Sequence, residues 1–225
     1  MKTPAPLRSK LMIRQRFKDS IIKSFFINRL ARSRTDSIVL TFDDGPHPVI
    51  TQQVLDLLSE YDARAVFFIV GSRIHTAPHV LKRILELGHI IGNHTYLHSN
   101  NTQPRFLEYR RDLVKCQSLI EEYSGQKPTL FRPPGGRISL SSLLIPRLLK
   151  LETVLWSLDS QDWAYYNDNN ASQISEHLLG RLVPGDIILL HDDNPNTPPV
   201  LERILPSIRN RKLDLWHGVD HLGAG

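Results

Sequence analysis

The sequence SIVLTFDDGP, residues 37–46, joins a short apolar run to a cluster of polar and turn-forming residues. Its first part is rich in β-branched and aromatic residues, which predicts a buried strand over 37–42. Two carboxylates, Asp43 and Asp44, follow directly, and a helical pattern then runs over 49–60. The order strand, polar loop, helix is the repeating unit of parallel α/β proteins.

The same order recurs along the rest of the chain. Further strands are predicted at residues 65–70, 89–91, 129–131, 153–156, 186–190 and 213–216. Further helices are predicted at residues 78–87, 104–123, 139–150, 171–182 and 198–211. Because strands alternate with helices throughout, the sequence predicts one α/β domain built on a parallel sheet.

Length and composition agree with a single globular domain. The chain has 225 residues, of which 40% are hydrophobic and 23% charged. Cys116 is its one cysteine, so an intramolecular disulfide is excluded. We expect a basic N-terminal extension over residues 1–35, followed by one domain over 36–225.

The positive charge is concentrated at the N-terminus. Residues 1–34 contain ten Lys and Arg but one acidic residue, Asp19, which gives this segment a charge of +9. The whole chain has 28 Lys and Arg and 23 Asp and Glu, so residues 35–225 contain 18 basic and 22 acidic residues. Since the body is mildly acidic, the net charge of +5 does not indicate a nucleic-acid-binding protein.

Two interpretations of residues 1–34 stay open. Apolar side chains lie roughly on one helical face, but basic residues interrupt that face. The segment is either a lead-in helix docked on the domain or a basic helix in peripheral contact with anionic lipid. The chain shows neither a membrane-spanning apolar run nor the apolar core of a signal peptide, so we expect a cytoplasmic protein, in the second case at the inner face of the membrane.

Polar clusters follow the ends of five predicted apolar strands. The carboxyl ends of parallel strands meet at one edge of the sheet, where α/β proteins place their sites. We therefore expect the five clusters to converge. They are DDGP (43–46), GNHTYLH (92–98), RPPGG (132–136), DSQDW (159–163) and His191.

The first two clusters have the residue types of a metal site. Asp43 and Asp44 form either an ordinary turn or a pair in which one carboxylate binds a cation and the other acts as a base. His94 and His98 lie four residues apart, which would place both on one face of a helix. Two histidines and a carboxylate can hold a metal with one open position. Thr95 stands where the zinc-protease motif has Glu, so the base must come from elsewhere, and Asp43 is the candidate.

The other clusters each have a structural and a functional interpretation. Arg132 forms either a surface salt bridge or a guanidinium held at the site by a stiff Pro-Pro-Gly-Gly loop. Asp162 and Trp163 are either a helix cap and a core aromatic or part of the site. His191 is either a core histidine or a site residue. Residues 192–195 read as an ordinary turn.

Taken together, these motifs resemble those of the polysaccharide deacetylases (NodB-homology domain, carbohydrate esterase family 4). The resemblance covers about residues 36–216. It rests on TFDDGP (41–46), HTYLH (94–98), RPPG (132–135), DSQDW (159–163) and LLH (189–191), in that order.

The resemblance implies a distorted (β/α) barrel with about seven parallel strands, and a hydrolase that removes N-acetyl groups from N-acetylglucosamine-type sugars. The substrate would be an oligosaccharide, a polysaccharide or a lipid-linked sugar. One divalent metal ion is implied, usually Zn²⁺, with Co²⁺ or Mn²⁺ as alternatives. Asp44, His94 and His98 match the metal ligands. The matching catalytic residues are Asp43 as base, oriented by Arg132, and His191 as acid, oriented by Asp162. The matching substrate-binding residues are Gly135, Trp163 and Leu189.

One position departs from the family pattern. Gly135 stands where the family usually has an aromatic residue, so a side chain that would flank the sugar is missing. This leaves open a same-fold amidohydrolase acting on a non-glycan amide or formamido group. A separate alternative is a non-catalytic glycan-binding protein, for which a missing ligand or base would be the mark, whereas every one of those positions is filled here.

Overall fold

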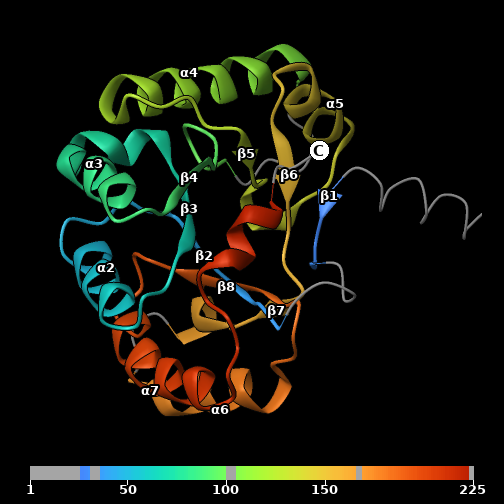
Figure 1. Cartoon of the computed structure of the whole chain (residues 1–225). Coiled ribbons are helices and arrows are strands. Elements are labelled where there is room, and N and C mark those ends of the chain that lie inside the picture. The colour runs from blue at the N-terminus through green and yellow to red at the C-terminus, as the bar shows by residue number, and fades with distance from the viewer. Residues whose placement is uncertain (1–25, 31–35, 100–104, 166–168, 223–225) are drawn as a thin grey trace, which may run out of the picture.

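A parallel sheet of eight strands forms the centre of the protein in the computed structural model, which describes residues 26–30, 36–99, 105–165 and 169–222 (Figure 1). The strands are β1 (Phe26–Ile27), β2 (Val39–Asp43), β3 (Ala65–Ile69), β4 (Ile90–Asn93), β5 (Leu130–Phe131), β6 (Glu152–Val154), β7 (Leu158–Asp159) and β8 (Ile187–His191). Their order is β1-β6-β5-β4-β3-β2-β8-β7, and all neighbours run parallel. The predicted distorted barrel of parallel strands is confirmed, with eight strands in place of about seven.

Six α-helices of the described residues surround this sheet (Figure 1). They are α2 (Ile50–Glu60), α3 (Pro78–Glu86), α4 (Phe106–Ser124), α5 (Leu140–Leu148), α6 (Ala171–Arg181) and α7 (Thr197–Asn210). Four short 3-10 helices join them: η1 (Gly71–Thr76), η2 (Pro134–Gly136), η3 (Asp162–Tyr165) and η4 (His217–His221). The predicted strand over 213–216 is wrong, because this segment makes only an isolated bridge between Ser37 and Asp214.

Strand alternation separates an outer and an inner face of the sheet. On β2, Leu40 and Phe42 belong to the large core cluster that packs against the helices. Val39 belongs instead to a smaller cluster with Phe68 and with Val219 of η4. Successive side chains of a strand point to opposite faces. Thr41 and Asp43 therefore share the inner face with Val39.

The sheet begins earlier in the chain than expected. Phe26 and Ile27, which lie within the expected basic extension, pair with Thr153 and Val154 of β6. Arg29 adds an ion pair of 2.7 Å to the buried Asp186. Residues 1–25 and 31–35, on which most of the prediction for the basic segment falls, lie outside the described residues. Among the described helices, none has the length and apolarity needed to cross a membrane.

Gly92 lets β4 pack closely against β3. A Cβ at this position would lie 2.4 Å from Cδ1 of the buried Phe68 ring. For Gly92→Ala we therefore expect the free energy of unfolding to fall by about 1–3 kcal/mol, measured by urea denaturation of the metal-free protein.

Gly180→Ala in α6 is the matched control. Nothing lies within 4 Å of a Cβ added there. We expect this change to raise the free energy of unfolding by about 0.5–1 kcal/mol, because alanine favours helix. Unchanged stability of Gly92→Ala would contradict the close packing of Phe68.

Candidate functional site

The predicted site residues gather at the carboxyl ends of the strands. Asp43 is the last residue of β2, and His191 is the last residue of β8, its neighbour in register. His94 follows β4, and Arg132 follows β5. Strands that are distant in sequence thus bring the polar clusters to one end of the sheet.

Asp44, His94 and His98 form a compact group. One possible ligand atom from each lies within 4.8 Å of the others. Oδ1 of Asp44 is 3.0 Å from Nε2 of His98 and 3.5 Å from Nε2 of His94. The two histidines, whose spacing would place them on one face of a helix, lie instead in a loop where Thr95 and His98 have positive φ angles of 67° and 50°. The loop, rather than a helix face, brings the imidazoles together.

The atoms of this group fit a bound cation. Nδ1 of His94 lies 2.8 Å from the carbonyl oxygen of Arg132, so Nδ1 donates its proton there and Nε2 keeps a lone pair. Burial lowers the pKa of His94 to about 3, which leaves the ring neutral at pH 7. Oδ1 of Asp44 is buried without a hydrogen-bond partner. A lone pair and a carboxylate oxygen thus face each other, and a divalent metal ion would satisfy both.

Asp43 is paired with Arg132. Nη1 of Arg132 donates to Oδ1 of Asp43 at 2.7 Å, and Oδ2 of Asp43 lies 3.6 Å from Nε2 of His94. Burial raises the pKa of Asp43, and the charges of Arg132 and His191 oppose the shift. A carboxylate that is more basic than usual, next to the candidate metal site, suits general-base chemistry.

Arg132 is the largest fully buried side chain among the described residues. Its Nε donates to the carbonyl of Val154 and its Nη2 to that of Leu155, both at 3.0 Å. Its Nη1 also contacts Oγ1 of Thr41 at 2.8 Å, and its Cζ lies 4.2 Å from the centre of the Phe68 ring. The guanidinium is therefore fixed, and this excludes the surface salt bridge as its role.

His191 is paired with the fully buried Asp162. Nδ1 of His191 is 2.7 Å from Oδ1 of Asp162, and Oδ2 of Asp162 accepts the backbone N–H of His191 at 2.9 Å. Burial by itself would lower the pKa of His191, but the hydrogen bond and charge of Asp162 outweigh it and raise the pKa to about 10. The ring is therefore a cation at neutral pH and has a proton to give.

The three predicted substrate-binding residues are placed differently from one another. Leu189 is buried on β8, two residues before His191 and so on the same face of the sheet. Trp163 lies in η3 beside Asp162, with 61% of its surface exposed. Gly135 lies in η2 with a φ of 59°, a left-handed backbone that favours glycine. Leu189 is therefore the buried one of these three residues.

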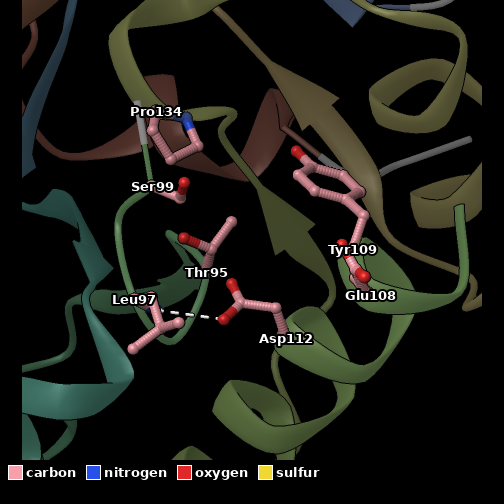
Figure 2. Close-up of a pocket in the computed structure, with 7 residues that line it drawn as sticks. All are labelled: Thr95, Leu97, Ser99, Glu108, Tyr109, Asp112 and Pro134. Carbon is pink, nitrogen blue, oxygen red and sulfur yellow. Dashed lines mark hydrogen bonds between the residues drawn. The ribbon is translucent and has the colours of Figure 1, made fainter. Parts of the chain in front are cut away.

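A cavity of about 150 Å³ opens beside the loop that carries the two histidines (Figure 2). Thr95 and Leu97 of the loop, Tyr109 and Asp112 of α4, and Pro134 of η2 line it. Figure 2 shows the carboxylate of Asp112 turned toward the loop, where it accepts the N–H groups of Tyr96 and Leu97 at 2.9 and 3.2 Å.

Sequence reasoning missed several residues that support the site. Asp112 binds the histidine loop from a helix, and no sequence motif marks it. Asp193, assigned to an ordinary turn, forms an ion pair of 2.6 Å with Arg73. Arg73 also donates to the backbone carbonyl of Asp44. These contacts involve backbone atoms or residues of no motif, so the sequence pattern gave no signal for them.

Comparisons with known proteins agree with this geometry. A family model described as polysaccharide deacetylase matches residues 31–154. A peptidoglycan-N-acetylglucosamine deacetylase of Bacillus cereus is 39% identical over 181 residues, which cover 77% of this chain and 82% of that protein. The peptidoglycan-N-acetylmuramic acid deacetylase PdaC of Bacillus subtilis is 34% identical over 178 residues, which cover 79% of this chain and 37% of PdaC.

A solved structure is similar over most of its length. It is a peptidoglycan N-acetylglucosamine deacetylase in complex with 4-naphthalen-1-yl-N-oxidanyl-benzamide, with a TM-score of 0.80 and 29% sequence identity. The similarity covers 88% of this chain and 92% of that one.

The pKa of His191 provides a direct test of its pairing with Asp162. For Asp162→Asn we expect this pKa to fall from about 10 toward the ordinary histidine value of about 6.5, because the hydrogen bond and charge of Asp162 are lost while the ring stays buried. An NMR titration of the imidazole in the metal-free protein measures it.

Asp159→Asn is the control for that titration. Asp159 carries a carboxylate three residues away that accepts the N–H of Gln161 instead. We expect this variant to titrate like the wild type. A His191 that still titrates near 10 in Asp162→Asn would refute the assigned pairing.

Proposed function

The chain belongs to the polysaccharide deacetylase family of hydrolases, which act on carbon–nitrogen bonds other than peptide bonds, and we propose that it removes N-acetyl groups from N-acetylglucosamine units of a glycan and releases acetate. The observation that carries this proposal is the group of Asp44, His94 and His98 between a buried carboxylate and a protonated histidine. Amide hydrolysis needs both a group that accepts a proton and one that donates a proton.

We propose a glycan of the peptidoglycan type as the substrate. The names of the relatives support this choice, and the relative with 39% identity is named for N-acetylglucosamine. Five of the seven residues lining the cavity of Figure 2 carry side-chain oxygens, which accept hydrogen bonds from sugar hydroxyls. Leu97 and Pro134 add apolar surface for the C–H faces of a sugar ring.

Asp44, His94 and His98 would hold the metal ion, most simply Zn²⁺, with Co²⁺ or Mn²⁺ as alternatives. When bound, it would polarise the amide oxygen and lower the pKa of a coordinated water. Asp43 takes the proton of the attacking water, with Arg132 holding its carboxylate in place. His191 gives its Nε2 proton to the leaving amine nitrogen, since Asp162 occupies Nδ1.

Gly135 belongs to the same mechanism through its backbone. We propose that its N–H donates to the oxygen of the amide as negative charge develops there, an interaction typically worth about 2.7–4 kcal/mol. The backbone N–H does not depend on the aromatic side chain that this position lacks. Trp163 and Leu189 would flank the acetyl group from the side of η3 and β8.

Acetate release tests the proposal. We expect metal-loaded protein to release acetate from N-acetylglucosamine oligosaccharides and from peptidoglycan. Asp43→Asn should lower kcat/KM by about 10²–10⁴-fold while the metal stays bound, because Asn keeps an oxygen for Arg132 but cannot accept the water proton. His98→Ala should lose both the metal and the activity.

Three outcomes would contradict parts of this scheme. Near-normal rates in Asp43→Asn would show that another group is the base. No acetate from any glycan, with one metal ion bound per chain, would favour the alternative of a non-glycan amide or formamido substrate. Glycan binding without turnover would favour a non-catalytic glycan-binding protein.

A further inference from the structure

The 3-10 helix η1 contacts both loops that carry the proposed metal ligands. The N–H groups of Gly71 and Ser72 donate to the carbonyls of Thr95 and Tyr96, each at 3.0 Å, and so hold the histidine loop. The N–H of Val70, just before η1, donates to the carbonyl of Gly45 at 2.9 Å. η1 therefore connects the loop of Asp44 with the loop of His94 and His98.

The side chain of Arg73, in η1, reaches the loop that carries Asp44. Its Nη1 donates to the backbone carbonyl of Asp44 and also to Oδ2 of Asp193, the latter at 2.6 Å. Asp193 follows His191 by two residues and is largely buried, with 11% of its side chain exposed. One guanidinium thus connects η1, the Asp44 loop and the segment after β8.

The backbone at Asp44 needs support of this kind. Its φ is +74°, a left-handed conformation that residues other than glycine keep only where their surroundings hold it. This conformation turns the carbonyl toward Arg73 and the carboxylate toward His94 and His98. If Asp44 relaxed to an extended backbone, its peptide would rotate and its carboxylate would leave the two imidazoles.

The next residue is held from its other side. A Cβ on Gly45 would lie 2.2 Å from Oδ2 of the fully buried Asp192, so the loop packs directly on that carboxylate. Oδ2 of Asp192 also accepts the hydroxyl of Thr51 at 2.6 Å, which fixes its position. The loop is therefore packed against Asp192 at Gly45 and bonded to Arg73 through the carbonyl of Asp44.

We propose that Arg73 is a positioning residue of the metal site: it holds the Asp44 peptide in its left-handed conformation and so sets the affinity of the site for its metal ion. The inference rests on the metal site of the proposed function. In this proposal Arg73 acts through the backbone carbonyl of Asp44 rather than by binding the metal ion or the substrate.

Zinc titration of the metal-free full-length chain, in competition with a chromophoric chelator, measures this role. Arg73→Met removes both hydrogen bonds and keeps an unbranched stem, whereas Arg73→Lys keeps one cation that can reach the carbonyl. Arg83→Met is the matched control. Arg83 lies on α3 and forms an ion pair with Asp56. Its side chain is 34% exposed, similar to the 40% of Arg73. Its hydrogen bonds in the described structure go to Gln52 and Asp56, and not to the loops of the proposed metal ligands.

We expect Arg73→Met to weaken Zn²⁺ binding by about 10- to 100-fold, as for other residues that orient metal ligands. Arg73→Lys should regain most of that loss, and Arg83→Met should stay within about twofold of the wild type, since exposed ion pairs contribute little. In excess EDTA, Arg73→Met and Arg83→Met should melt at similar temperatures. The difference in zinc affinity then reports positioning rather than general stability.

Zn²⁺ binding by Arg73→Met as tight as by Arg83→Met would overturn the inference while leaving the proposed function intact. A wild-type chain that binds no Zn²⁺, like His98→Ala, would overturn the proposed metal site, and the inference with it. The two failures are therefore distinguishable in one set of titrations.

Discussion

The ion pair between the buried guanidinium of Arg132 and the carboxylate of Asp43 is the interaction on which the rest of the site depends. The guanidinium lies on the inner face of the sheet, where it bonds side chains of β2 and carbonyls at the end of β6. A buried ion pair adds little net stability, but removal of one partner typically costs about 3–5 kcal/mol, because the other charge stays buried and unpaired. Asp43 and Arg132 therefore require each other, and their strands must stay in register for the pair to form.

The alternation of side chains along the strands explains how a polar centre coexists with a well-packed protein. On the outer face of β2 and β8, the side chains that pack in the core beneath the helices are Leu40, Phe42, Ile188 and Leu190. The inner face of these strands carries apolar residues toward their amino ends, and Asp43 and His191 at their carboxyl ends. The α-helices pack on the outer face of the sheet, and the polar side chains lie at the end of its inner face.

Much of this arrangement could be predicted from the sequence, because its signals are local. An apolar run followed directly by a polar cluster marked Asp43, His94, Arg132 and His191, and each of them lies at or just after the end of a strand. The strands β1 and β7 were not predicted, because Phe26 and Ile27 lie in the basic segment that was expected to be helical, and Leu158 and Asp159 lead directly into the polar cluster at 159–163. The apolar segment 213–216 has the composition of a strand but makes only an isolated bridge.

Contacts through the backbone could not be predicted in the same way. Arg73 reaches the carbonyl of Asp44 across 29 residues, and Asp112 reaches the N–H of Tyr96 across 16. Any residue has a carbonyl and nearly any has an N–H, so the acceptor and donor leave no trace in the sequence pattern. The positive φ angles of Thr95 and His98 are likewise set by the folded loop, and no sequence pattern indicates them.

Arg132 contributes to two functions through two different parts of the same residue. Its side chain holds Asp43, and its backbone carbonyl fixes the tautomer of His94. During evolution the side chain can change at this position, but the carbonyl persists in every amino acid. A descendant that replaced Arg132 would therefore lose the support of Asp43, the proposed base, while it kept the carbonyl that orients His94, a proposed metal ligand. Divergence in this fold can thus yield a protein that still carries a metal ion after hydrolysis has been lost, and metal content alone does not identify the active members.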